Sequence, residues 1–276
     1  MSKRGKLVAG IILGTLCLIF ICAISYTIAK KYVDNILYEE RDLRLVQEYG
    51  QYSGESISAR GYDITLDKYI FDKATGNVYY LFRMSKEDSD AKVEIDERDF
   101  TGGLLDSVNG FYFSVQANGG SVGGNRTKYD GNELLIYGHI QYDCYNIEDE
   151  GVIQIRDLTI NDEEGRFGGC VAKFTLEPNV ESYEFVGKSI RINISQYAIK
   201  TESKTIRSVN DPVITFYYKD GTSKVVVDGP NGIGMGNSSS YSSGNYNAHC
   251  YILNATADVD NIEYILYNEE KIYISE

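Results

Sequence analysis

The sequence predicts an all-β protein: two tandem antiparallel β-sandwiches preceded by one N-terminal transmembrane helix and a short helical stalk. Three observations lead to this expectation. The chain of 276 residues contains one unbroken apolar run, Leu7–Ala29. Apolar and polar residues alternate through much of the chain after residue 60, and turn sequences rich in glycine and asparagine separate the alternating stretches. Short strands at such spacing are typical of antiparallel sandwiches.

The apolar run is long enough to cross a membrane. As a helix it would extend roughly 35 Å, and the hydrocarbon core of a bilayer is about 30 Å thick. Lys3, Arg4 and Lys6 crowd its N-terminal side. Because basic residues favour the cytoplasmic side, we expect a cytoplasmic tail at residues 1–6, a single-pass helix at 7–29 in the cell membrane, and an extracytoplasmic C-terminal part. A signal peptide cleaved after Ala29 is the alternative, although the run exceeds the usual signal core of about 7–15 residues.

The segment after the apolar run predicts a stalk at residues 30–56. Apolar residues between Val33 and Val46 recur with partly helical spacing among charged residues. The membrane helix is therefore expected to continue as an amphipathic helix that ends before Gly50.

Alternation places the strands of a first sandwich at residues 57–178 and a second at 186–276. Tyr62, Ile64 and Leu66 share one face of a strand, whereas the denser apolar run Val78–Met84 suits a strand covered on both faces. Ile190–Ile199 echoes Tyr62–Phe71 at a constant offset, which suggests a repeat. The other expected strands are Phe111–Val115, Leu134–Tyr142, Val152–Ile160, Val171–Leu176, Val213–Tyr218, Lys224–Asp228, Ile252–Ala257, Ile262–Tyr267 and Lys271–Ile274.

Some of these strand sequences resemble a known family. Gly61–Lys68, followed by Asn77–Phe82, looks like the start of an immunoglobulin-like domain of unknown function, and Cys170–Glu177 and Ser189–Ile199 resemble its end and the start of a second module. That domain occurs in membrane-anchored ectodomains of Gram-positive bacteria. The resemblance implies tandem immunoglobulin-like domains. Many relatives look like anti-sigma-factor ectodomains, but the six residues before the apolar run leave no room for a cytoplasmic sigma-binding domain.

Charge limits the partners of the extracytoplasmic part. The whole chain has a formal net charge of −13, and all 40 acidic residues follow Lys31. Nucleic acid and anionic lipid headgroups are therefore poor partners, whereas cations, basic peptides and neutral glycans are compatible. We expect contact with membrane lipid through the N-terminal helix, and an envelope protein or glycan as the partner outside.

The cysteines allow one disulfide and predict no metal site. Cys144 and Cys170 flank expected strands of the first sandwich, so they could form a bridge; buried free thiols are the alternative. No Cys-x-x-Cys or paired-histidine spacing is present, so neither a metal nor a cofactor is expected.

No motif predicts a catalytic residue. Ser121 lies in a Gly-x-Ser-x-Gly pattern, but a nucleophile elbow needs a helix directly after the serine, and a loop and a strand are expected there. His139 and His249 have no partner at ligand spacing, so structural or surface roles are expected. The acidic clusters at 87–90 and 161–164 do not match a calcium-binding loop.

If the protein binds a ligand, the contacts are expected in the loop Gly229–Asn247. It is rich in glycine and serine and contains Tyr241, Asn245 and Tyr246, which are adaptable contact residues. A mobile connection between strands is the alternative. Together these features predict a non-enzymatic membrane protein that binds, senses or supports the cell envelope. An accessory signalling subunit and, with less support, a serine hydrolase acting through Ser121 are the other interpretations.

Overall fold

A computed structural model describes residues 41–59, 61–86, 91–93, 112–117, 125–142, 151–159, 172–203, 212–228, 236–243, 246–253 and 256–274. The predicted cytoplasmic tail and the predicted transmembrane helix at 7–29 lie outside these residues. Within the described ranges, no helix is long and apolar enough to cross a membrane. The chain divides into two units, residues 1–44 and residues 45–276. Residues 41–49 are helical, and all other regular structure described below belongs to the second unit.

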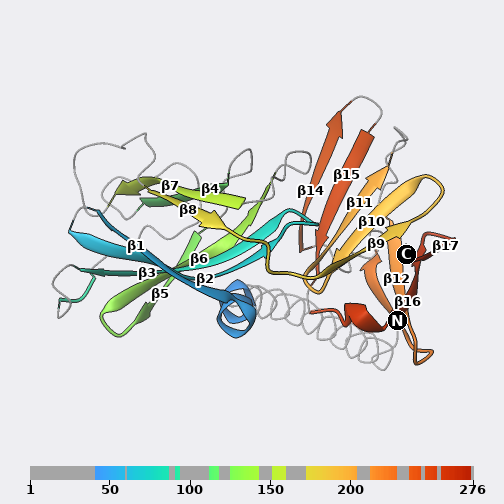
Figure 1. The fold of residues 1–276 in the computed structure, drawn as a ribbon, viewed down its shortest axis with the longest axis horizontal. Coiled ribbons are helices and arrows are strands. Elements are labelled where there is room, and N and C mark those ends of the chain that lie inside the picture. Colours follow the sequence, from blue (N-terminus) through green and yellow to red (C-terminus); the bar gives the residue numbers. More distant parts are fainter. Residues whose placement is uncertain are drawn as a thin grey trace, which may run out of the picture. The chain divides into compact units, whose positions relative to one another are not determined.

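The second unit is built from antiparallel β-sheets, as the alternation predicted (Figure 1). Its first sheet has the strand order β1-β2-β3-β6-β5, and a three-stranded sheet has the order β4-β7-β8. The strands of these two sheets are β1 (Gln51–Ala59), β2 (Tyr62–Asp72), β3 (Asn77–Lys86), β4 (Tyr112–Ala117), β5 (Asn125–Asp130), β6 (Glu133–Gln141), β7 (Gly151–Thr159) and β8 (Ala172–Leu176).

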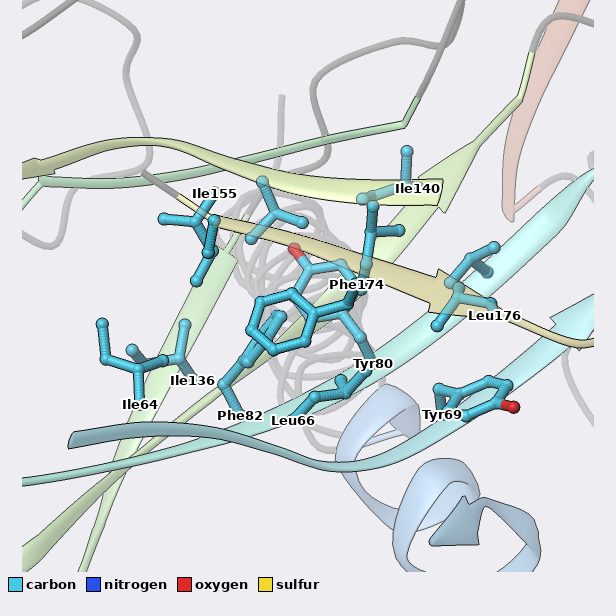
Figure 2. Close-up of a cluster of buried hydrophobic side chains, with 14 of the residues drawn as sticks. Ile64, Leu66, Tyr69, Tyr80, Phe82, Ile136, Ile140, Ile155, Phe174 and Leu176 are labelled. Carbon is cyan, nitrogen blue, oxygen red and sulfur yellow. The ribbon is translucent and has the colours of Figure 1, made fainter. Parts of the chain in front are cut away.

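The first hydrophobic core lies between these two sheets. Ile64 and Leu66 of β2 are fully buried, and Phe82 of β3 meets Phe174 of β8 edge to face, with ring centroids 5.3 Å apart (Figure 2). Residues 77–82 are all buried, so the prediction that this strand is covered on both faces is confirmed.

Two further sheets enclose a second core. A five-stranded sheet has the order β14-β15-β11-β10-β9, and a four-stranded sheet has the order β13-β12-β16-β17. Isoleucines at alternate positions of β10 and Phe216 of β12 are buried in this core. The strands are β9 (Ser182–Val186), β10 (Ile190–Ser195), β11 (Ala198–Ser203), β12 (Val213–Tyr218), β13 (Ser223–Asp228), β14 (Gly236–Ser243), β15 (Tyr246–Ile252), β16 (Ile262–Tyr267) and β17 (Glu270–Tyr273).

Three details differ from the sequence-based expectation. The first sheet begins inside the predicted stalk, because β1 starts at Gln51 and pairs with β2. Residues 236–243 form strand β14 rather than a loop, since pairing with β15 supplies backbone hydrogen bonds that outweigh the low strand propensity of glycine and serine. The predicted strand Ile252–Ala257 is wrong, because β15 ends at Ile252.

The sequence echo is not a structural repeat. Tyr62–Phe71 lies within one continuous strand, β2, whereas the matching Ile190–Ile199 is divided into β10, a tight turn and β11. The two sequences share only their alternation of apolar residues. One long strand and a hairpin of two strands both show this alternation, because every strand directs every second side chain to the same face.

We expect the core pair to determine stability. Replacing Phe82 with alanine should lower the free energy of unfolding by roughly 3–5 kcal/mol, the usual cost of deleting a buried phenylalanine ring. Urea unfolding followed by circular dichroism measures this cost. Tyr52, which is 68% exposed on β1, is the control: its alanine variant should stay within about 0.5 kcal/mol of the wild type. Similar losses for both variants would contradict the assigned core.

Candidate functional site

Two hairpin turns, one from each pair of sheets, meet in a buried junction. The turn between β2 and β3 runs from Asp72 to Asn77. It is closed by a hydrogen bond from the Gly76 amide to the Asp72 carbonyl at 2.8 Å, and the Thr75 amide donates to Asp72 Oδ1 at 3.2 Å. Gly76 has a φ of 75°, a conformation that glycine adopts without steric cost.

The turn between β10 and β11 has Gln196 and Tyr197 at its tip. Ser195 Oγ accepts hydrogen bonds from the amides of Tyr197 and Ala198, both at 3.1 Å. A serine hydroxyl that binds the backbone two and three residues onward favours a turn over a continuing strand. This local chemistry explains why β10 ends at Ser195, whereas β2 continues without a turn through the matching part of its sequence.

The carboxyl group of Asp72 joins the two turns. It is fully buried, accepts hydrogen bonds from the Thr75 hydroxyl and amide of its own turn, and is hydrogen-bonded to the Ser195 side chain of the other turn. Burial raises the pKa of Asp72 above its ordinary value of 3.8, although hydrogen bonds from Ser195 and Thr75 oppose that shift.

Asn77 makes the second connection. Its Nδ2 donates to Thr75 Oγ1 at 2.8 Å and to Sγ of Cys250, on β15, at 3.2 Å. Its Oδ1 lies 2.7 Å from His139 Nε2, on β6. Because the carboxamide oxygen can only accept, the histidine nitrogen is the donor in this contact.

This arrangement brings a cysteine, an asparagine and a histidine together in a non-catalytic order. An activated cysteine needs its base within direct hydrogen-bond reach. Here Asn77 lies between Cys250 and His139, and Cys250 is fully buried. The cluster therefore has the properties of a structural polar network, in which Asn77 is hydrogen-bonded to Thr75, Cys250 and His139.

Tyr197 brings the end of the helical segment 41–49 into the same junction. Its ring centroid lies 6.0 Å from that of Tyr79 on β3 and 6.3 Å from that of Tyr49, at the end of the helical segment. Tyr79 in turn packs on His139, with centroids 4.7 Å apart. Burial, together with the nearby charges of Tyr49, Asp72 and Glu48, raises the pKa of Tyr197 to about 12.

The step from helix to strand is tight. Gly50 donates its amide to the carbonyl of Val46 at 2.9 Å, and β1 begins at the next residue. A Cβ atom at position 50 would lie 2.3 Å from the Val46 oxygen, so only glycine fits there. Lys68 Nζ donates to the carbonyl of Gln47 at 2.6 Å, which satisfies one of the last carbonyls of the helix. No flexible linker separates the helical segment from β1.

The connection between the two cores is also held by hydrogen bonds. Asn179, between β8 and β9, accepts from the amide of Phe71 through its side chain at 2.7 Å and donates to the Tyr69 carbonyl at 3.1 Å. Its own amide donates to the Phe71 carbonyl at 3.2 Å. This connection therefore runs along the end of β2 that leads into the junction.

The structure describes only some of the residues that the sequence singled out. His139 lies at the junction, where it is hydrogen-bonded to Asn77. His249 points away from it, stacks on Tyr251 with ring centroids 6.3 Å apart, and has its pKa lowered by burial. The backbone of Tyr241 lies in β14 and that of Tyr246 begins β15, but their side chains are not described. Asn245, Ser121, Cys144, Cys170 and both acidic clusters lie outside the described residues.

Sequence reasoning missed Asp72, Asn77, Ser195 and Tyr197 as a group. Only Thr75–Asn77 carries a sequence signal, which predicts a turn between two strands. The partners are far apart in sequence, and nothing in alternation indicates which turn contacts which. Among the residues that the structure describes, no group of three or more His, Cys, Asp or Glu side chains could hold a metal ion.

Comparison with known proteins adds little. No protein-family model matches the chain, and no curated protein matches it significantly. One similar solved structure is the crystal structure of a conserved domain protein from Bacillus anthracis, with 10% sequence identity and a TM-score of 0.42. The match covers 80% of this chain and 77% of that one, and a likeness this weak supports no conclusion about function.

The raised pKa of Asp72 predicts a pH dependence. Because the folded-state pKa lies above the ordinary value of 3.8, the folded protein holds this proton to higher pH than the unfolded chain. The stability of the wild type relative to Asp72→Asn should therefore fall as the pH rises from about 4 through the folded-state pKa. Urea unfolding of both proteins across this range measures the difference.

Asp220 provides a control with the opposite sign. It lies in an exposed turn, where hydrogen bonds from the hydroxyl and amide of Thr222 lower its pKa. The wild type should therefore lose stability relative to Asp220→Asn as the pH falls. A pH-independent difference for Asp72→Asn would contradict the assignment of a buried carboxyl group.

Removing the central amide tests the network directly. Asn77→Ala deletes the acceptor of the His139 N–H and the donor to Cys250, so the free energy of unfolding should fall by about 1–3 kcal/mol. Asn261→Ala, at an exposed site, should change it by no more than about 0.5 kcal/mol. Equal stability of Asn77→Ala and wild type would show that the network does not stabilise the fold.

Proposed function

We propose that this protein is a non-enzymatic, single-pass membrane protein whose extracytoplasmic part binds, senses or supports components of the cell envelope. The observation that most supports this proposal is that the potentially reactive side chains of the junction are held in structural contacts. Cys250 and Asp72 are fully buried in contacts that join the two pairs of sheets, and the half-buried His139 is hydrogen-bonded to Asn77 of the same junction. Groups held in this way serve architecture rather than turnover.

The architecture fits two tandem immunoglobulin-like β-sandwiches. Each core is enclosed by two antiparallel sheets, the first by five and three strands and the second by five and four. This proposal takes its family from the resemblance of the strand sequences, and the sheet composition is compatible with it. The N-terminal helix would hold the two sandwiches at the outer surface of the cell membrane.

One observation favours an accessory signalling role as a second candidate. The helical segment runs into β1 without a linker, and Tyr49 contacts Tyr197 in the junction. A change at the junction, caused by a ligand on either sandwich, would therefore reach the end of the stalk through packed side chains. Such a protein would act on another membrane protein through its membrane helix.

The location is tested by protease accessibility. In intact bacterial spheroplasts that express the full chain, protease added outside should degrade the C-terminal part, because the basic residues before the apolar run keep only the N-terminus inside. A cytoplasmic marker protein should survive the same treatment. Protection in intact spheroplasts with degradation after lysis would place the sandwiches inside the cell and contradict the proposal.

A further inference from the structure

The outer face of the sheet β13-β12-β16-β17 has an unusual composition. Its inner face packs in the second core through Ile214, Phe216, Ile265 and Ile272. On the outer face, strand pairing aligns the side chains into two rows that cross all four strands. The tyrosine row is Ser223, Tyr217, Tyr264 and Tyr273, and the second row is Val225, Thr215, Leu266 and Lys271.

An outer sheet face normally presents polar and charged side chains to water. Here three of eight residues are tyrosines, two more are aliphatic, and Lys271 is the one charged residue of the two rows. Tyr273 is 53% exposed and Val225 is 42% exposed, so the face is accessible. The chain as a whole has a net charge of −13, yet neither row contains an acid. Exposed apolar patches of this kind often mark interaction sites.

Two rings of the tyrosine row are stacked on each other, and the third is tilted. Tyr217 and Tyr264 are stacked with centroids 4.6 Å apart and an interplanar angle of 10°. That distance is close to the usual spacing between neighbouring strands, about 4.7–4.9 Å, as expected for rings that stack along the direction that joins the strands. Lys271 Nζ lies 3.5 Å from the centroid of Tyr264 and 4.8 Å from that of Tyr273. Because Lys271 belongs to β17 and Tyr217 to β12, they cover opposite faces of Tyr264.

This geometry determines which ligands fit. Both faces of Tyr264 are covered, so no slot is open beside it for a proline ring of an extended peptide. A polyanion would meet a single cation on a strongly acidic protein. A cationic peptide would meet Lys271, and the nearby acid Glu263 already interacts with that ammonium group. What the rows offer is a line of hydroxyl groups, one ammonium group, and the exposed ring of Tyr273.

We propose that the tyrosine row, with Lys271, is a binding site for a neutral, hydroxyl-rich oligosaccharide. The phenol hydroxyls and the Lys271 ammonium group exchange hydrogen bonds with sugar hydroxyls, and Tyr273 contacts the apolar face of a sugar ring. Tyrosine serves this purpose because it supplies rigid contact area and a polar tip at low entropic cost. This inference rests on the proposed function, because it names the class of ligand that the extracytoplasmic part would bind.

An oligosaccharide array tests the site. The purified full-length chain, in detergent, is applied to immobilised neutral and acidic oligosaccharides and to extended proline-rich peptides. The wild type should be retained on neutral oligosaccharides, with little dependence on salt because no charge pairing is involved. Combining Tyr217→Phe with Tyr264→Phe keeps the stacked rings and removes two hydroxyls, so affinity should fall about tenfold or more, the equivalent of roughly 1.4 kcal/mol.

Two controls separate binding from folding. Tyr52→Phe, on exposed strand β1, should leave retention unchanged. The double phenylalanine variant should unfold at the same urea concentration as the wild type, so its weaker binding reports the lost hydroxyls. Retention on no neutral oligosaccharide, retention on peptides only, or equal retention of the double variant and the wild type would each overturn the proposal. None of these outcomes depends on the membrane location, which the spheroplast experiment tests separately.

Discussion

A carboxyl group that is completely buried is tolerated only where hydrogen-bond donors surround it. Asp72 finds its donors on both sides of the junction: Thr75 belongs to its own hairpin turn, and Ser195 to the turn between β10 and β11. Separating the two turns would remove one donor from Asp72 and, at the same time, the Cys250 contact of Asn77. Leaving these buried groups without hydrogen-bond partners would cost free energy of folding. This cost determines that the β2–β3 turn contacts the β10–β11 turn, and therefore how the two cores are joined.

The same junction gives the protein its proposed mode of action. Tyr197 touches the end of the stalk through Tyr49 and the first core's sheet through Tyr79. The outer sheet that presents the tyrosine row encloses the second core, whose β10–β11 turn ends in Tyr197. A ligand bound at the tyrosine row therefore acts on the same compact unit that contains the last turn of the stalk. Support, binding and signalling would all use this one connection.

Sequence reasoning succeeded where local patterns decide structure. Alternation located β2, and a dense apolar run identified β3 as buried on both faces, because side-chain period and burial are local properties of a strand. It failed at β14, where glycine and serine carry no strand signal and pairing with β15 decides the conformation. It also failed at the junction. Asn77 and Cys250 are distant in sequence, so only the folded chain reveals their contact.

Because the junction joins the two cores through buried hydrogen bonds, it should make them unfold together. The chain contains no tryptophan, so a single tryptophan in place of Tyr129, beside the first core, or of Tyr267, beside the second, reports one core at a time. Urea unfolding should show coincident transitions for the two reporters. Adding Ser195→Ala and Asn77→Ala, which weaken the junction from both turns, should separate them. Unfolding transitions that already differ when the junction is intact would show that the junction does not couple the two cores.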